Sequence, residues 1–170
     1  MGLSADTGGF RFANADAGSF AAAGGMLAAG ADMELVNRCA FFSKPLNQQR
    51  LEADLVLNHL EMRLGGALAV GRITGAMLTE HAFDMRDGEG IIERLRELDG
   101  VKAAVLISPR GGGLKISART RAGTVSAAEI LREFGGGGHE LAAGLQLDGP
   151  DAEAVKDRVL ERFAEELEKP

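Results

Sequence analysis

The sequence has neither tryptophan nor tyrosine among its 170 residues, which excludes a binding site built on those rings. A single cysteine, Cys39, excludes an internal disulfide bond and a cysteine-rich zinc site. The stretch from Phe20 to Ala31 is rich in Ala and Gly, and it is too short and too weakly apolar to cross a bilayer. Residues 1–6 have no basic head or apolar run of the signal-peptide type. We therefore expect a cytoplasmic protein with no membrane partner.

The composition that remains is globular. Hydrophobic residues make up 45% and charged residues 26% of the chain, enough to bury a core. The net charge of −6 argues against a duplex-DNA partner bound through its phosphates. The charge is uneven, because residues 101–135 contain six basic and two acidic residues, whereas residues 148–170 contain eight acidic and four basic residues. The basic segment predicts either an anion-binding site or a solvated surface of mixed charge.

The first part of the chain has a mainly helical pattern. Its expected elements are a strand end at residues 3–6, a helix over 17–29, a helix capped by Asp32, and a helix over 46–62 that begins after Pro45. Cys39 falls on the apolar side of the second of these helices, so we expect it in the core. A lone strand without a neighbour is unusual for a complete domain.

Near Gly65 the sequence pattern changes to one that predicts alternating strands and helices. The expected strands cover residues 67–73, 101–107, 114–119 and 143–147, and the expected helices cover 74–81, 88–98, 126–134 and 151–167. The glycine turn at 111–113 favours an antiparallel hairpin. Ser126 begins a capping box that opens its helix. Together these patterns predict an α/β fold.

The strongest local motif is four consecutive glycines, Gly135 to Gly138, followed by His139. Glycines lack a Cβ, so consecutive backbone N–H groups can converge on an anion, and a histidine at the loop exit can donate to a phosphate. The motif is not a P-loop, because no Lys-Ser or Lys-Thr follows the glycines. The alternative is a flexible linker or a helix stop with an incidental histidine.

Two other features of the sequence are candidate functional sites. Lys115, Ser117 and Arg119 have the spacing of two that puts side chains on one face of a strand, where they form a phosphate-binding surface or merely a solvated face. Asp6 precedes the Gly8-Gly9 turn, a position that suits a metal ligand or a carboxylate that caps backbone groups. One carboxylate cannot hold a manganese ion.

These motifs resemble those of the DHH phosphoesterase family, and the resemblance extends over essentially the whole chain. The glycine–histidine motif, followed by Ala142-Ala143-Gly144, resembles the signature of that family's C-terminal associated domain. Segment 115–119 and Glu89-Gly90 resemble two further parts of the same domain. Residues 6–11 resemble the last motif of the catalytic DHH domain. The most similar type is the oligoribonuclease and pAp-phosphatase branch, to which cyclic-dinucleotide phosphodiesterases are close.

The resemblance implies three parts. Residues 1–45 are expected to be a helical remnant of an incomplete catalytic domain, with an exposed apolar surface, and residues 46–64 a connector helix. Residues 65–170 are expected to be a small α/β substrate-binding domain, a mixed sheet flanked by helices. The family's first three motifs, which supply most metal ligands, do not occur in these 170 residues. We therefore expect no turnover from this chain alone.

The resemblance also implies a site. The complete family site holds two manganese ions that activate the attacking water, and Asp6 matches one ligand; we do not expect this chain alone to hold them. The residues implied in phosphate binding are Arg11, Lys115, Ser117, Arg119, Gly135, Gly136, Gly137, Gly138 and His139. The implied partners are short single-stranded RNA or a mononucleotide bisphosphate, a DHH catalytic half in cis or in trans, and, in one arrangement, a second copy of the chain.

Three functions follow from these observations. The first is the substrate-binding portion of a manganese-dependent phosphodiesterase or phosphatase that acts on very short oligoribonucleotides and pAp, with a cyclic-dinucleotide phosphodiesterase as a variant. The second is a module that binds nucleotides or RNA ends without hydrolysis. The third is a structural or oligomerisation domain in which the glycines only turn the chain.

Overall fold

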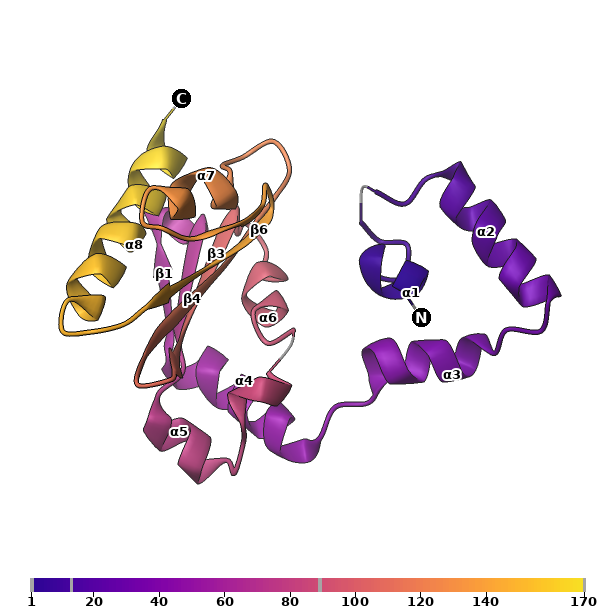
Figure 1. Ribbon diagram of the computed structural model, residues 1–170, viewed down its shortest axis with the longest axis horizontal. Coiled ribbons are helices and arrows are strands. Elements are labelled where there is room, and N and C mark those ends of the chain that lie inside the picture. The colour runs from indigo at the N-terminus through magenta and orange to yellow at the C-terminus, as the bar shows by residue number, and fades with distance from the viewer. Residues whose placement is uncertain (1, 13, 89, 170) are drawn as a thin grey trace. The chain divides into compact units, whose positions relative to one another are not determined.

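The computed structural model describes residues 2–12, 14–88 and 90–169, so Glu89 of the Glu89-Gly90 pair lies outside the described residues (Figure 1). Contacts divide the chain into two compact units, residues 1–45 and residues 46–170. Each is described by itself below. None of the described helices combines the length and the hydrophobicity needed to cross a membrane.

The regular elements in the described part of the first unit are all helical. Its elements are α1 (Gly2–Asp6), α2 (Ala17–Ala28), α3 (Met33–Asn37) and the π-helical turn η1 (Arg38–Phe42). Asp32 is the N-cap that the sequence predicts, since its Oδ1 accepts from the Leu35 backbone N–H at 2.9 Å. Asp16 caps α2 in the same way, with the Ser19 N–H at 2.7 Å.

The strand predicted at residues 3–6 is wrong, because these residues form helix α1. The described part of residues 1–45 contains no strand with which they could pair. A helical turn satisfies the backbone groups locally, whereas an isolated strand leaves them unpaired. The Thr7 hydroxyl closes the turn by donating to the Leu3 carbonyl at 2.7 Å and accepting from the Phe10 N–H at 3.1 Å.

The core position predicted for Cys39 is also wrong, because Cys39 is exposed. It lies in η1, whose wider turn breaks the 3.6-residue period on which the prediction rested. Several large apolar side chains of this unit face solvent, as predicted: Phe42 is 78% exposed, and none of the described ones in residues 1–45 is buried. The others with substantial exposure are Phe12, Phe20, Met26, Leu27 and Leu35.

The second unit is built on a six-stranded mixed sheet in the order β1-β2-β3-β4-β6-β5. The strands are β1 (Leu60–Arg63), β2 (Leu68–Arg72), β3 (Ala103–Arg110), β4 (Gly113–Thr120), β5 (Gly137–His139) and β6 (Ala142–Leu147). Only the β2–β3 pair is parallel. A parallel pair needs a long crossover, and residues 73–102 supply it.

Helices cover both faces of this sheet (Figure 1). On one face, α7 (Ala127–Arg132) and α8 (Ala152–Glu168) pack on a core that includes Ile116, Leu145 and the fully buried Phe163. On the other face, α4 (Leu46–Asn58), α5 (Gly75–Glu80) and α6 (Glu93–Arg96) pack on a second core. The second core covers β2 and β3 through Ala69, Ala104 and Leu106, and includes no residue of β4, β5 or β6. The part of this face formed by β4, β5 and β6 thus contributes no residue to the second core.

Three sequence predictions about elements need correction. The helix predicted over residues 46–62 ends at Asn58, and residues 60–63 pair with β2 as edge strand β1. The helix predicted over 88–98 shrinks to α6, because the chain before it makes tighter turns such as Ile91 N–H to Gly88 O. Residues 137–139, expected in a loop, form strand β5. The strand errors share a cause, since pairing depends on a distant partner.

Candidate functional site

Strand β4 carries the three polar side chains that the sequence predicts on one face, and the prediction is confirmed. Ser117 pairs with Leu106 of β3 and Arg119 pairs with Ala104, both members of the second core. Paired residues point to the same side of a sheet, so Lys115, Ser117 and Arg119 lie on the face that α4, α5 and α6 cover in part. The alternate residues of β4, Ile116 and Ala118, are buried in the opposite core.

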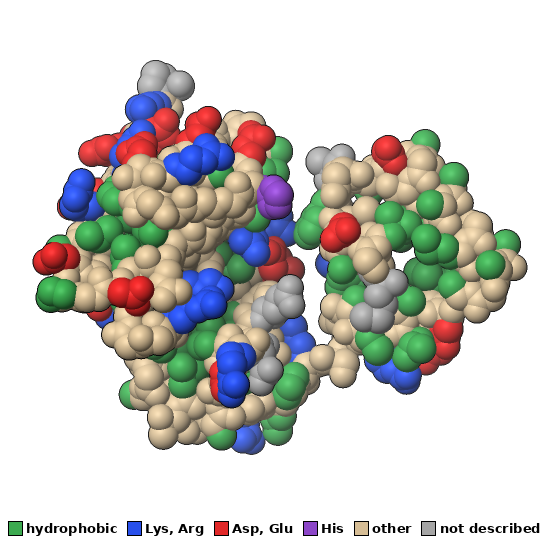
Figure 2. Space-filling view, viewed as in Figure 1, with side chains coloured by type: hydrophobic (Ala, Val, Ile, Leu, Met, Phe, Trp, Pro, Cys, Tyr) green, Lys and Arg blue, Asp and Glu red, His purple; other side chains and the backbone are tan. Residues whose placement is uncertain are grey.

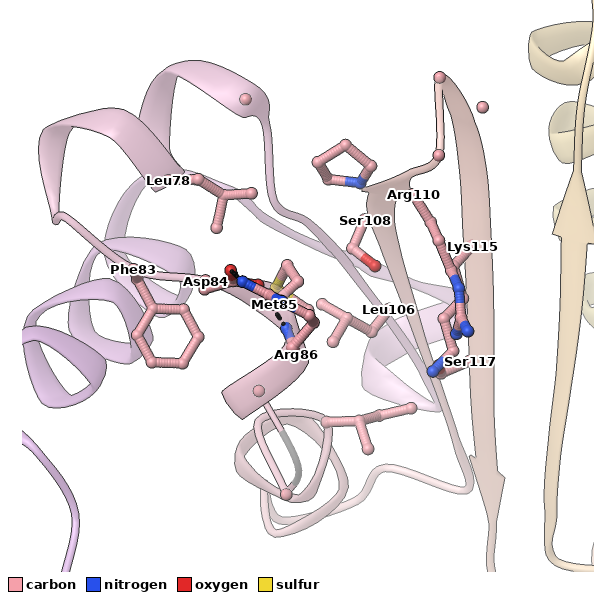
Figure 3. Close-up of a pocket in the computed structure, with 18 of the residues that line it drawn as sticks. Leu78, Phe83, Asp84, Met85, Arg86, Leu106, Ser108, Arg110, Lys115 and Ser117 are labelled. Carbon is pink, nitrogen blue, oxygen red and sulfur yellow. Dashed lines mark hydrogen bonds and ion pairs between the residues drawn. The ribbon is translucent and has the colours of Figure 1, made fainter.

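Lys115, Ser117 and Arg119 line a cleft of about 1260 Å³. Figure 3 shows Lys115 and Ser117 on one wall of it. Ser108 and Arg110 of β3 lie on the same wall. The residues of the opposite wall share a single segment that follows α5, together with one residue of α5 itself: Leu78, Phe83, Asp84, Met85 and Arg86. One wall is therefore largely polar and basic, and the other offers apolar surface.

The cleft is electropositive. Its described lining includes four basic residues, Arg86, Arg110, Lys115 and Arg119, against the single acid Asp84. Figure 2 shows several Lys and Arg side chains on the visible face of this unit, close to hydrophobic ones. Among the described residues, Arg110 and Lys115 make no ion pair with a carboxylate. A partly buried lysine without a carboxylate partner favours an anion beside it.

Asp84 and Arg86 form a local pair at the cleft. Asp84 accepts from the Arg86 guanidinium at 2.6 Å and from the Arg86 backbone N–H at 2.8 Å. These hydrogen bonds, the guanidinium first, lower the pKa of Asp84 to about 2. Asp84 is therefore ionised at neutral pH and offsets the charge of Arg86.

The first two glycines of the motif, Gly135 and Gly136, end helix α7. Gly135 has a φ of +87°, its N–H donates to the Arg132 carbonyl at 3.1 Å, and the Gly136 N–H donates to the Leu131 carbonyl at 2.8 Å. This pair of bonds is the Schellman motif that ends α7. The predicted nest of consecutive amides does not form at Gly135 and Gly136, because both N–H groups are already bonded.

The rest of the motif forms strand β5, and its glycines differ. A Cβ on Gly136 would lie 2.7 Å from the Gly144 carbonyl oxygen, and one on Gly138 would lie 2.5 Å from that of Ala142. A Cβ on Gly137 would meet nothing within 4 Å. The close packing of backbone on backbone therefore requires glycine at 136 and 138, whereas position 137 is open.

Pairing of β5 through β6 to β4 brings the motif to the cleft face. Gly137 pairs with Gly144, which pairs with Ser117, and His139 pairs with Ala142, which pairs with Arg119. The residues between the polar side chains and His139 thus carry a methyl group or nothing. We call Gly137, Ala142 and Gly144 the bare platform. His139 is exposed at its far edge.

Asp6 and Arg11 belong to the first unit. The Arg11 Nε donates to the Gly8 carbonyl at 2.7 Å, and its guanidinium lies 5.5 Å from the centre of the Phe41 ring. The Asp6 carbonyl accepts from Asn14 at 3.0 Å. No three Asp, Glu, His or Cys side chains converge as metal ligands in the part of the chain that the structure describes. The residues present therefore do not fit a manganese pair, and we derive no step through one.

Several residues of this site are not predicted from the sequence. Asp84 and Arg86 lie in a segment without strong periodicity, and Glu93 lies in the helix predicted over residues 88–98; nothing in the sequence connects the three to β4. Arg110 is counted in the basic segment 101–135, and its place beside the hairpin glycines is the signal that could have singled it out. The crossover between β2 and β3 puts the first three next to a strand far along the chain.

Comparisons with known proteins agree with this geometry. The profile of the DHHA1 domain matches residues 66–169. A bifunctional oligoribonuclease and PAP phosphatase, NrnA of Thermus thermophilus, is 36% identical over 167 residues, which cover 98% of this chain. An A-adding tRNA nucleotidyltransferase of Geobacter sulfurreducens is 28% identical over 173 residues. An exopolyphosphatase-related protein from Bacteroides fragilis superposes with a TM-score of 0.85 at 23% identity, over 98% of this chain and 49% of that one.

The chain spans only part of these relatives. It covers 49% of the Thermus protein and 19% of the Geobacter protein. The structural match at 23% identity shows the fold: a six-stranded mixed sheet flanked by helices.

Proposed function

We propose that this chain, which belongs to the DHHA1 domain family, binds the terminal phosphate and the adjoining nucleotide of very short oligoribonucleotides and of pAp-like nucleotides. The relative NrnA is named for activity on these two classes, an oligoribonuclease and a PAP phosphatase. In this proposal the chain is the substrate-binding portion of a manganese-dependent phosphodiesterase or phosphatase. A DHH catalytic part, in cis or in trans, supplies the metal site and the hydrolysis.

One observation carries the proposal: Lys115, Ser117 and Arg119 line one wall of a cleft and border the bare platform, whose only side chain is the methyl group of Ala142. A guanidinium, a hydroxyl and an ammonium group are the donors that proteins use for phosphate. The bare platform leaves room for a sugar or a base beside the phosphate. The apolar wall with the half-buried Leu78 and Met85 gives the base a surface to pack on.

The size of the site favours short ligands. From Lys115 to Arg119 the strand advances by about 13 Å, at roughly 3.3 Å per residue. That span suits one or two nucleotides, and the acidic chain around it, with net charge −6, repels a long polyanion. A grip on the end of a short strand is consistent with both features.

The test is isothermal titration calorimetry with 5′-phosphorylated diadenylate and with pAp. We expect micromolar binding by the wild type and a loss of about tenfold or more in Arg119→Ala and His139→Ala. Arg132→Ala is the matched control, because Arg132 is exposed on α7 at the opposite face of the sheet. A folded wild type that binds neither ligand contradicts the proposal.

Hydrolysis is tested separately by combining the chain with a DHH catalytic part. We expect mononucleotide release from diadenylate only when that part and manganese are both present. If the combined protein binds diadenylate but never releases a mononucleotide, a binding module without hydrolysis becomes the better description.

A further inference from the structure

Helix α6 connects the cleft to the body of the second unit through a carboxylate. Glu93, at the start of α6, accepts from the Arg119 Nε at 3.0 Å through Oε1 and from the Arg96 Nε at 2.5 Å through Oε2. The side chains of Glu93 and Arg119 are 29% and 33% exposed. The contact is therefore partly shielded from water, and it holds the arginine that the proposed function places on the phosphate.

The contact leaves the arginine able to bind. A guanidinium carries five N–H groups. In Arg119 the Nε–H is bonded to Glu93, and one N–H of Nη1 is bonded to the Ala118 carbonyl at 3.1 Å. Three N–H groups, on Nη1 and Nη2, remain for a ligand. They suffice for a two-point interaction with a phosphate.

The charge of the cluster also permits binding. Glu93 is shared by two arginines, so its single negative charge is not given to Arg119 alone. A carboxylate that only competed with phosphate would be expected to neutralise its arginine. Here it restricts the rotamers of a long side chain, which would otherwise lose that freedom on binding.

Helix α6 is itself fixed. Four residues are too few for a helix to be stable on its own. Arg94 donates to Glu52 of α4 at 2.7 Å, and Glu52, with a side chain only 4% exposed, also accepts from Gln48 at 2.9 Å. Leu95 is fully buried beneath it. Glu93 therefore extends from a rigid support.

We infer that Glu93 is a positioning residue, which orders Arg119 for a two-point interaction with a ligand phosphate. The inference rests on the proposed function, because it needs Arg119 to contact the phosphate. It predicts that removing the negative charge of Glu93 weakens the binding of an anion at the neighbouring site. Electrostatic repulsion alone would predict the opposite, because a carboxylate repels an anion.

The test compares Glu93→Ala with Glu93→Gln by calorimetry with 5′-phosphorylated diadenylate. We expect Glu93→Ala to weaken binding about five- to tenfold, since it frees the guanidinium. Glu93→Gln retains an oxygen acceptor, so we expect its affinity to stay within about twofold of the wild type. Glu97→Ala is the matched control: it removes the same charge next to α6, at a carboxylate whose described ion pair is with Arg94, at 3.7 Å, and not with Arg119.

A second measurement needs no ligand. The Arg119 Nε–H resonance, assigned with Arg119→Lys, is expected to be visible and slow to exchange in the wild type and in Glu93→Gln, and lost in Glu93→Ala. Thermal unfolding of each variant separates a local effect from loss of the fold.

The outcomes separate the two proposals. Tighter binding by both Glu93 variants, or unchanged binding by a folded Glu93→Ala, overturns the positioning role while Arg119→Ala still tests the phosphate site. Absence of binding by the folded wild type overturns the proposed function, and the positioning role falls with it.

Discussion

Arg119 of β4 and His139 of β5 lie in one cross-strand row of the sheet, with only the methyl side chain of Ala142 of β6 between them. Two strand spacings separate their backbones by roughly 10 Å. A basic side chain and an imidazole thus stand at opposite edges of the bare platform, and a nucleotide laid on the platform could be held from both sides.

Replacement of Arg119 by lysine is expected to weaken diadenylate binding nearly as much as replacement by alanine, about tenfold. A lysine has a single ammonium group and cannot keep Glu93 while presenting two donors to a phosphate. Calorimetry measures the effect, with Arg132→Lys as the control. Wild-type affinity in Arg119→Lys would mean that charge alone matters at this position.

Replacement of Gly137 by leucine is expected to block the platform without unfolding the protein. Position 137 has open space around it and does not need a positive φ, so stability should change by less than about 1 kcal/mol. Ligand affinity should fall at least about tenfold, because the side chain occupies the place proposed for the nucleotide. Gly25→Leu, at an open position of α2, is the control. Unchanged affinity in Gly137→Leu would remove the platform from the site.

Replacement of Gly136, by contrast, is expected to destabilise the protein. In Gly136→Ala the new Cβ would lie 2.7 Å from the Gly144 oxygen and 3.0 Å from the Leu131 oxygen, both backbone atoms. The strands must shift, so we expect a loss of about 1–3 kcal/mol in the free energy of unfolding. Urea denaturation measures it, and Gly137→Ala provides the comparison. Equal stability of the two variants would contradict the close approach.

The pKa of Asp84 offers a test of the cleft wall by NMR titration of its carboxyl carbon. In the folded protein this pKa lies at about 2, below the ordinary value of 3.8, so the interaction stabilises the fold above pH 3.8 and is lost as the pH falls towards 2. Arg86→Ala removes the main cause, and the pKa should rise towards its ordinary value. It should remain somewhat low, because the backbone N–H of residue 86 still donates. A titration unaffected by Arg86→Ala would show that the pair does not form.

The first unit is expected to promote self-association, because its large apolar side chains are exposed. Sedimentation velocity over a range of concentrations should show species larger than a monomer. Phe42→Glu should reduce them, whereas Leu57→Glu, at a similarly exposed position on α4 in the second unit, should not. A monomer at all concentrations would contradict this expectation.

The sequence predicted those parts of the structure that depend on neighbouring residues. The caps at Asp32 and Ser126 are helix starts because a side-chain oxygen accepts from an N–H three residues on. The alternation along β4 follows from the pleat of a strand. The apolar residues of α8, such as Val159 and Phe163, are buried because a period near four keeps them on one side.

The errors in predicted secondary structure occur where pairing with a distant segment, or the lack of one, determines the conformation. Strand β1 forms because it pairs with β2, and strand β5 forms because it pairs with β6. Neither segment has a local sequence pattern that predicts an extended backbone. Residues 3–6 form α1 rather than a strand because the described part of their unit contains no strand to pair with.

The sequence by itself therefore determined the identity of the phosphate-binding candidates on β4 and the glycine–histidine motif. Only the tertiary structure decided how they combine. Pairing of β4, β6 and β5 puts Arg119 and His139 in one row, and the β2–β3 crossover brings Asp84 to the cleft and Glu93 to Arg119. The physical reason is that side-chain spacing follows local backbone geometry, whereas contacts between segments follow from the burial of two cores.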